Sequence, residues 1–314
     1  MQHIRNTIGV LATGGTSAGT AGSAAEEVDY RAGTVAVDQL VATLPAPPSA
    51  LLVLEQVAQI DSKDADGAFW LHLAARCRHW LDQSEITGLV IPHGTDTLEE
   101  TAYFLSRVLP TTKPVVLTCA MRPASAHAPD GPRNLLDAIH LATDSHATGV
   151  LAVCAGDVHS AFNVQKVHTS RLNAFASGDA GPLAQFSDRR LIWQRNCPSA
   201  LIQKPLFAIE KIASAVQLPR VEIVMNHAGA TGLVVRALVQ SGVQGLVAAG
   251  TGNGTLSRSL EAALIDAQAA GVRVMRASRC DLGDVRPSAG DPFEPSLGLS
   301  AVKARIALML DLLG

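Results

Sequence analysis

The fold is decided by two stretches of sequence, IGVLATGGT at residues 8–16 and GLVIPHGTDT at residues 88–97. In each, a short apolar run ends in a glycine–threonine cluster, which is typical of a buried strand of a parallel sheet. Ligands of such sheets lie just beyond the carboxyl ends of the strands. We therefore expect Thr16 and Thr95 to face one crevice, where glycines let a substrate approach the backbone closely.

Strand and helix signals alternate through the first part of the chain. We expect strands over residues 51–58, 114–118 and 149–154, and helices over residues 69–81, 97–109 and 134–142. The glycine- and serine-rich segment 17–25 is predicted to be a loop. This alternation predicts an α/β fold with a doubly wound, mostly parallel sheet.

The regular alternation lapses between Arg195 and Pro219 and then resumes. We expect a larger N-terminal domain over residues 1–195, a linker over 196–219 and a smaller C-terminal α/β domain over 220–314. The second domain is predicted to contain strands at 221–225, 245–249 and 272–277, with helices near 232–239, 256–270 and 300–313. A length of 314 residues is consistent with two domains.

The composition is that of a globular protein, with 47% hydrophobic and 17% charged residues. A net charge of −3 and a pI of about 6.4 give no support for nucleic acid or a membrane surface as a partner. No segment approaches the roughly 18 apolar residues of a membrane span. The first strand follows soon after Met1, so no signal peptide is visible, and we expect a cytoplasmic protein, or a periplasmic one if a signal was removed.

The cysteines and histidines show no metal-binding pattern. Five cysteines are scattered without CxxC spacing, which favours reduced core thiols. Ten histidines include no HxxxH or HExxH pair. We therefore expect no metal.

Each threonine cluster has a simpler explanation when it is taken alone. Thr16, Thr95 and Asp96 are all residue types that favour turns and helix N-caps. The first cluster also lacks the lysine of a phosphate-binding loop and does not match GxGxxG. Their joint placement at two strand ends of one sheet is what favours a catalytic site.

A threonine hydroxyl needs a base and a proton donor before it becomes a useful nucleophile. Candidates in loops are Tyr30, Lys166 and the segment 61–64, Asp-Ser-Lys-Asp. Each has an alternative explanation, as a packing residue, a surface lysine and a turn respectively. His93 is interpreted as a residue whose hydrogen bonds shape the loop.

Several strings in one order carry a family resemblance. The chain resembles the bacterial-type L-asparaginases, which include the glutaminase-asparaginases, from the first strand to the last helix. The matching strings are TGGT at 13–16, HGTDTLEET at 93–101, AMRP at 120–123, DGP at 130–132, NL at 134–135 and GNG at 252–254.

The resemblance implies hydrolysis of a side-chain amide to a carboxylate and ammonia, without a metal or organic cofactor. Thr16 matches the nucleophile and Tyr30 the residue that relays its proton. Thr95, Asp96 and Lys166 match the second catalytic group. Covalent acyl transfer through Thr16 is the expected mechanism, a variant of serine–lysine catalysis. A lysine with a pKa of about 10.4 in water acts as a base only if burial lowers that pKa.

The resemblance also implies the substrate contacts. Ser62 matches the residue that binds the α-carboxylate, Asp96 the anion that pairs with the substrate ammonium, and Thr95 lies beside them. Asn253 matches a residue that one subunit contributes to the active site of its neighbour. Lys63 stands where the family commonly has Gln or Glu, so either its ammonium points away or recognition of the substrate amine is weaker.

The expected assembly is a homotetramer built from dimers with shared active sites. The family's acidic residue from the neighbouring subunit has no clear counterpart, and Asp284, Asp291 and Glu294 are the candidates.

Three functions remain open on the sequence. The first is an L-asparaginase, and the second is a glutaminase-asparaginase, because one methylene changes binding by only ~1–3 kcal/mol. A relative that deamidates glutamine for tRNA charging is disfavoured by the lack of basic charge. The third is a non-catalytic protein that binds amino acids, which would have no need of Thr16, Tyr30 and Lys166 together.

Overall fold

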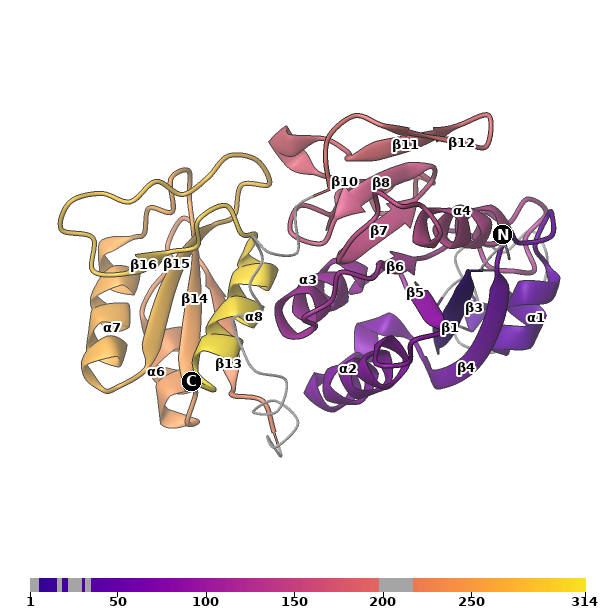
Figure 1. Cartoon of the computed structure of the whole chain (residues 1–314). Helices are drawn as coiled ribbons and strands as arrows, with labels where there is room; N and C mark the ends of the chain where they lie inside the picture. The colour runs from indigo at the N-terminus through magenta and orange to yellow at the C-terminus, as the bar shows by residue number, and fades with distance from the viewer. Residues whose placement is uncertain (1–5, 16–18, 22–29, 32–34, 198–216) are drawn as a thin grey trace. The chain divides into compact units, whose positions relative to one another are not determined.

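The computed structural model describes residues 6–15, 19–21, 30–31, 35–197 and 217–314 (Figure 1). The chain divides into two compact units, Met1–Ile209 and Glu210–Gly314. Most of the expected linker, residues 198–216, lies outside the described residues. The domain limits 1–195 and 220–314 therefore stay predictions.

Five parallel strands form the centre of the N-terminal sheet. They are β1 (Thr7–Gly14), β4 (Leu51–Ile60), β5 (Ile86–Pro92), β6 (Val115–Thr118) and β7 (Val150–Cys154). In the sheet they follow the order β4-β1-β5-β6-β7. Counted along the chain this is the 2-1-3-4-5 order, whose switch point lies between the first and third strands. A ligand is therefore expected at the carboxyl ends of β1 and β5.

The register brings those two carboxyl ends to the same edge. β1 pairs in parallel with both β4 and β5, with Val10 opposite Leu54 on one side and Val90 on the other. Val10 and Val90 are fully buried, because helices cover both faces of the sheet. The apolar runs of the sequence are thus explained by burial on two sides.

Three antiparallel strands extend the sheet beyond β7. β8 (Asp157–Ser160), β11 (Ala184–Ser187) and β12 (Arg190–Trp193) complete the order β7-β8-β11-β12 (Figure 1). The sequence did not predict these strands, because each has only four residues and none is a continuous apolar run. The prediction of a mostly parallel sheet is confirmed.

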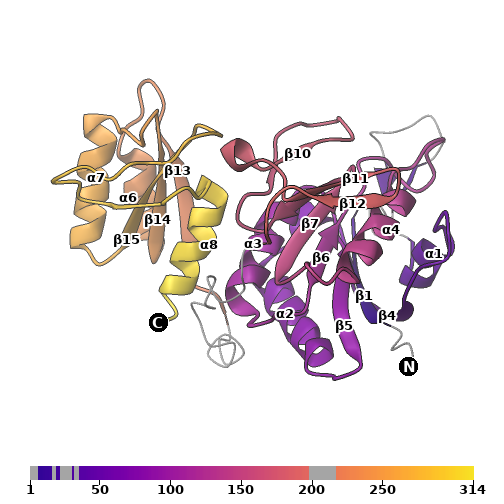
Figure 2. The same ribbon diagram turned by 45° about the horizontal axis from the view of Figure 1, so that its top comes forward.

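Two pairs of helices cover the two faces. α2 (Gly67–Leu81) and α3 (Leu98–Val108) pack together on one face, while α1 (Val37–Ala42) and α4 (Gly131–Ala142) cover the other (Figure 2). The first pair is joined by stacked rings of Trp70 and Phe104, whose centroids lie 5.2 Å apart. The sheet is therefore doubly wound, as expected.

Short elements surround the carboxyl edge of the sheet. β2 (Thr20–Ala21) pairs with β3 (Tyr30–Arg31), and β9 (Gln165–Lys166) pairs with β10 (Phe175–Ala176). Single turns of 3₁₀-helix span Ser62–Asp64 and Gly178–Ala180. Three of these elements carry expected site residues, namely Tyr30, Ser62 and Lys166.

The C-terminal unit has its own parallel sheet, in the order β13-β14-β15-β16. α6 and α7 pack together on one face and α8 packs on the other (Figure 1). The bounds are β13 (Val221–Met225), β14 (Gly245–Gly250), β15 (Arg273–Ser278), β16 (Glu294–Pro295), α6 (Leu233–Gln240), α7 (Arg258–Ala269) and α8 (Ala301–Asp311). The expected smaller α/β domain is confirmed as a fold.

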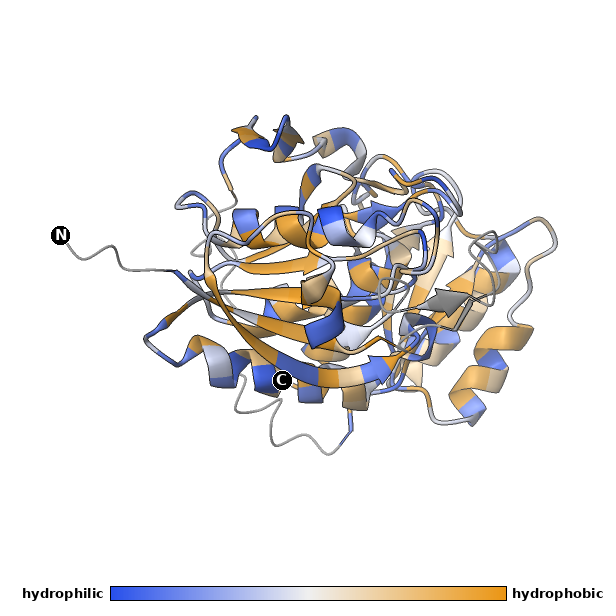
Figure 3. Cartoon of the chain, turned by 90° about the vertical axis from the view of Figure 1, so that its right-hand side faces the viewer, coloured by the Kyte–Doolittle hydropathy of each residue, from blue (hydrophilic) through white to orange (hydrophobic). Residues whose placement is uncertain are grey.

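Figure 3 shows apolar residues concentrated along the strands, whereas polar residues are interspersed on the helices. Within the described part of the chain, no helix has the length and apolar character that crossing a membrane requires.

Candidate active site

The carboxyl ends of β1 and β5 meet through two glycines. A Cβ on Gly15 would overlap the main chain of Gly94, and a Cβ on Gly94 would lie 2.6 Å from Ser62 Cβ. Gly15 also has a φ of +80°, in the left-handed region that favours glycine. Its amide donates to the Ile60 carbonyl at 3.0 Å. The GGT and HGT strings are therefore needed for close approach of three chain segments.

Lys166, Thr95 and Asp96 come together at this edge. Lys166 Nζ donates to Thr95 Oγ1 at 2.8 Å and to Asp96 Oδ1 at 2.6 Å. The Lys166 side chain is 19% exposed and that of Asp96 is 49% exposed. The structure thus combines an ammonium, a hydroxyl and an accessible carboxylate in one cluster.

The alternative of helix capping does not account for these side chains. The N-cap of α3 is Thr97, and its hydroxyl donates to the Ser62 carbonyl at 2.8 Å. Thr95 and Asp96 precede the cap, and their side chains contact Lys166 instead. Thr95 therefore belongs to the Lys166 cluster and is not the helix cap.

Ser62 is buried beside the cluster. Its Oγ accepts the backbone N–H of Asp96 at 3.1 Å, so the hydroxyl proton is left for another acceptor. Asp61 caps the turn by accepting the amide of Lys63. The turn interpretation of residues 61–64 is thus correct, and the same turn brings Ser62 to the site.

His93 is held in one neutral tautomer behind the site. Trp70 Nε1 donates to Thr101 Oγ1 at 3.0 Å, and this hydroxyl lies 3.1 Å from His93 Nε2. Since a carbonyl oxygen only accepts, His93 Nδ1 donates to the Gly94 carbonyl at 2.8 Å, and Nε2 of the neutral ring accepts from the Thr101 hydroxyl. Burial lowers the pKa of His93 to about 4. The predicted role of His93 in shaping the loop matches these hydrogen bonds.

Lys63 does not direct an unpaired ammonium at the site. Its Nζ forms an ion pair with Asp61 and the side chain is 63% exposed. The hydrogen bond from Lys63 to Asp61 raises the pKa of the lysine. Of the two possibilities raised for Lys63, this pairing favours an ammonium that points away from the substrate.

Polar side chains fasten the loop after β6. The Asp130 carboxylate accepts the amides of Met121 and Arg122, both at 2.9 Å. Asn134 Nδ2 donates to the Cys119 carbonyl at 2.9 Å. These contacts explain the AMRP, DGP and NL strings as structural supports of the site edge.

Sequence reasoning did not identify one neighbour of Lys166. The backbone amide of Lys166 donates to Glu99 Oε1 at 3.3 Å, which fastens β9 to the first turn of α3. The only sequence signal at Glu99 was a negative charge at a helix N-terminus, which suits the helix dipole equally well.

Two expected catalytic residues cannot be placed. Thr16 follows Gly15 directly but lies outside the described residues. Tyr30 has its backbone in β3, opposite Ala21, while its side chain is not among the described ones. Their roles stay predictions.

Asn253 belongs to the C-terminal unit. Its Nδ2 donates to the Arg286 carbonyl at 3.1 Å and its Oδ1 accepts the Arg286 amide at 2.7 Å. Among the three acidic candidates nearby, Asp291 pairs with Arg276 and Glu294 with Arg273. Of these candidates, Asp284 is the one for which no arginine pair is found in the described part of the chain.

The described site offers an ammonium, a hydroxyl and a carboxylate in mutual contact. No group of three or more His, Cys, Asp or Glu side chains in the described ranges is arranged to hold a metal ion. The cluster can donate hydrogen bonds to a developing anion through Lys166 and can bind a cation through Asp96.

Residues 7–199 match the family Asparaginase, N-terminal, and residues 220–313 match the Glutaminase/Asparaginase C-terminal domain. An L-asparaginase 2 of Escherichia coli strain K12 is 38% identical over 313 residues, covering 97% of this chain and 88% of that protein. A glutaminase-asparaginase of Pseudomonas fluorescens biotype A is 36% identical, covering 96% and 85%.

The fold has a solved counterpart. A crystal structure of a probable cytoplasmic L-asparaginase from Campylobacter jejuni superposes with a TM-score of 0.92 at 35% identity, covering 98% of this chain and 95% of that one. Because the family matches both units and the relatives match nearly the whole chain, this protein belongs to the asparaginase family of amidohydrolases.

Proposed function

We propose that this protein is an L-asparaginase that hydrolyses L-asparagine to L-aspartate and ammonia, with Thr16 as nucleophile. The observation that carries the proposal is the cluster of Lys166, Thr95 and Asp96 at the β1/β5 switch point. Sheets of this order bind ligands there. The names of the Escherichia coli and Pseudomonas relatives support the class of substrate.

The described groups suit a free amino acid. Ser62 has a hydroxyl proton to donate to the α-carboxylate, because its oxygen accepts from Asp96. Half-exposed Asp96 pairs with the α-ammonium through its carboxylate. Charge-assisted hydrogen bonds of this kind are stronger than neutral ones and fix the orientation of the substrate.

Hydrolysis then proceeds in two acyl-transfer steps. Thr16 Oγ attacks the side-chain amide carbon while Tyr30 takes its proton and relays it to the leaving nitrogen. Ammonia leaves, and the aspartyl group stays bound to Thr16 as an ester. Water, positioned by Thr95 and Lys166, adds to the ester carbon and releases aspartate. Lys166 supports the negative charge that develops on the carbonyl oxygen.

The proposed assembly is a homotetramer of dimers in which Asn253 completes a neighbour's site. Its support is local: two hydrogen bonds to the Arg286 backbone hold the exposed Asn253 amide in place, and one N–H and one oxygen lone pair remain for a contact with a neighbouring subunit. We place the protein in the cytoplasm, because the scattered cysteines of the sequence favour thiols kept in a reducing compartment.

A glutaminase-asparaginase is the second candidate, favoured by the similarity to the Pseudomonas fluorescens protein. Ammonia release from asparagine and glutamine, measured side by side at equal concentrations, tests both. A clear excess with asparagine supports the first proposal, and comparable rates support the second. No release from either substrate would contradict both and favour a protein that only binds amino acids.

A further inference from the structure

Two cysteines stand side by side at the carboxyl ends of neighbouring strands. Cys119 directly follows β6 and Cys154 ends β7, one position beyond the register pair Thr118–Val153. Their Sγ atoms lie 3.3 Å apart, and the residues are 2% and 3% exposed. Neighbouring strands are spaced about 4.8 Å apart. That spacing falls within the roughly 4.4–6.8 Å between Cα atoms that a disulfide requires.

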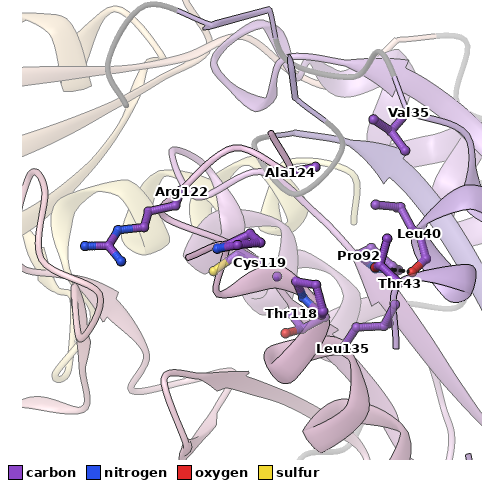
Figure 4. A pocket seen from close by; sticks show the side chains of 12 residues that line it. Val35, Leu40, Thr43, Pro92, Thr118, Cys119, Arg122, Ala124 and Leu135 are labelled. Carbon is purple, nitrogen blue, oxygen red and sulfur yellow. Dashed lines mark hydrogen bonds between the residues drawn. The ribbon is translucent and has the colours of Figure 1, made fainter. Parts of the chain in front are cut away.

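A cavity reaches one member of this pair. It has a volume of about 220 Å³ and lies between α1 and α4, next to the carboxyl ends of β5 and β6 (Figure 4). Cys119 is one of its lining residues, together with apolar side chains such as Leu40 and Leu135. Apart from Arg122 and two threonines the lining is apolar, and such a lining favours a small neutral molecule over a charged one. Cys119 is thus within reach of a small solute although it is almost fully buried.

We propose that Cys119 and Cys154 form a redox-active dithiol, which hydrogen peroxide entering through this cavity converts to an intramolecular disulfide. Hydrogen peroxide is small and neutral, as the cavity requires. The site is distinct from the amidohydrolase cluster, and neither cysteine has a role in the proposed hydrolysis.

The chemistry balances without another reactant. The Cys119 thiolate attacks one peroxide oxygen, the O–O bond breaks, and the departing hydroxide combines with the thiol proton as water. Cys119 is now a sulfenic acid. Cys154 sulfur attacks Cys119 sulfur, the S–O bond breaks, and a second water leaves with the Cys154 proton. The two sulfurs together lose two electrons and peroxide gains them.

The surroundings set the rate of the first step. The hydrogen bond with Cys154 and burial hold the pKa of the Cys119 thiol well above its usual range, and the charge of Asp130 acts in the same direction. Lys166 offsets part of this effect. Thiolate is therefore scarce at neutral pH, and oxidation accelerates roughly tenfold per pH unit below that pKa. The second step is fast because the two sulfurs are already in contact.

The disulfide would act on the strand end that supports the active-site loop. The His93 amide donates to the Thr118 carbonyl at 2.8 Å, one residue before Cys119. An effect on turnover rests on the proposed asparaginase function. The test therefore measures formation of the disulfide itself, which does not depend on catalytic activity.

The full-length chain with Cys280→Ser, which removes the exposed thiol, is treated with hydrogen peroxide at pH 7 and pH 9. It is then quenched, denatured and alkylated with N-ethylmaleimide. We expect a mass loss of about 2 Da, two alkylated thiols instead of four, and a cross-linked peptide joining Cys119 to Cys154. Dithiothreitol should reverse the change, and the rate should be higher at pH 9. Adding Cys197→Ser, a matched control outside the pair, should leave the cross-link unchanged.

Four alkylated thiols after peroxide, or Cys119 recovered as a sulfinic acid beside a free Cys154, would overturn the proposal. In Cys154→Ser the Cys119 sulfenic acid should persist and be trapped by dimedone. If that variant does not fold, phenylarsine oxide, which bridges adjacent thiols, should remove the same two alkylation sites from the unoxidised chain. Failure to bridge them would equally contradict the proposal.

Discussion

Gly15 lies directly against the main chain of Gly94, and Gly94 lies against the Ser62 side chain, so neither glycine position has room for a Cβ atom. This contact joins the carboxyl end of β1 to the loop that carries Thr95. It also brings Gly94 against Ser62, the expected carboxylate-binding residue. The spacing of the site is therefore set by the close approach of two glycines to each other and to Ser62.

Gly15→Ala is expected to lower both stability and activity. Alanine at a positive φ costs about 1–2 kcal/mol, and at Gly15 the overlap with Gly94 adds to this cost. Displacement of the site by about 1 Å lowers turnover on the order of 100-fold. Urea unfolding and ammonia release measure the two effects.

Gly149→Ala is the matched control, because Gly149 also has a positive φ of +69° but no atom within 4 Å of its Cβ position. Gly149→Ala should lose only the stability that alanine costs at a positive φ, and it should keep its activity. Equal losses in the two variants would show that the contact with Gly94 is unimportant.

Lys166→Met is expected to lower kcat by about 10²–10³-fold, the usual effect of removing one donor that stabilises a developing oxyanion. The fold should survive, since Lys166 is partly exposed on a two-residue strand. Steady-state kinetics with asparagine and circular dichroism measure the two properties.

Lys63→Met serves as control for the loss of a paired lysine near the site. Because the Lys63 ammonium is already bound by Asp61 in an exposed pair, kcat and KM should change by no more than about threefold, as is usual for surface ion pairs. A large fall in KM would mean that Lys63 repels the substrate ammonium after all.

Because His93 is buried in its neutral form, the folded protein should lose stability as the pH falls. Its folded pKa of about 4 lies below the unfolded value of about 6.5, so between these values the unfolded chain binds the proton and the folded chain does not. The free energy of unfolding should fall by on the order of 3 kcal/mol as pH drops from 6.5 to 4. Urea unfolding at a series of pH values measures this slope.

His93→Gln should be less stable at pH 7, because the buried hydrogen bonds to Thr101 and Gly94 are lost or altered, but its stability should depend less on pH. His146→Gln, at an exposed position, should retain the slope of the parent protein. An unchanged slope in His93→Gln would show that His93 is not kept neutral.

Thr16→Ala is expected to abolish turnover, and Asn253→Ala to lower it strongly, if sites are shared between subunits. The decisive measurement mixes the two inactive variants after reversible subunit dissociation. Hybrids then contain sites with Thr16 from one variant and Asn253 from the other, so partial activity should return. Full activity of Thr16→Ala would instead assign the nucleophile to Thr95, and no recovery on mixing would contradict shared sites.

The central strands could be predicted because burial on two faces gives them continuous apolar runs. Residues 8–12 and 88–91 are of this kind, and β1 and β5 extend them by only one or two residues at each end. β12 shows why the antiparallel strands at one side of the sheet could not be predicted. Its Ile192 is 53% exposed and its neighbours alternate in burial, so four residues carry too weak a pattern.

The site could be predicted only in part. The strand ends indicated that Thr95 and Asp96 belong to a crevice, but Lys166 is 70 residues further on, in a strand of two residues that no periodicity reveals. The resemblance to a family supplied it. The pairing of Lys63 with Asp61 depends on the rotamers of the two side chains, and no pattern in a single sequence reveals these.

The order of the strands has a consequence for synthesis. β1 is made first but stands between β4 and β5, so its edges stay unpaired until both have been translated. At that point Ser62 already exists and Asp96 follows shortly after the end of β5, whereas the lysine that binds Asp96 comes 70 residues later. At ribosomal rates of about 5–20 residues per second this is a delay of roughly 4–14 s. On the nascent chain the groups that would hold a substrate thus precede the ammonium that completes the cluster.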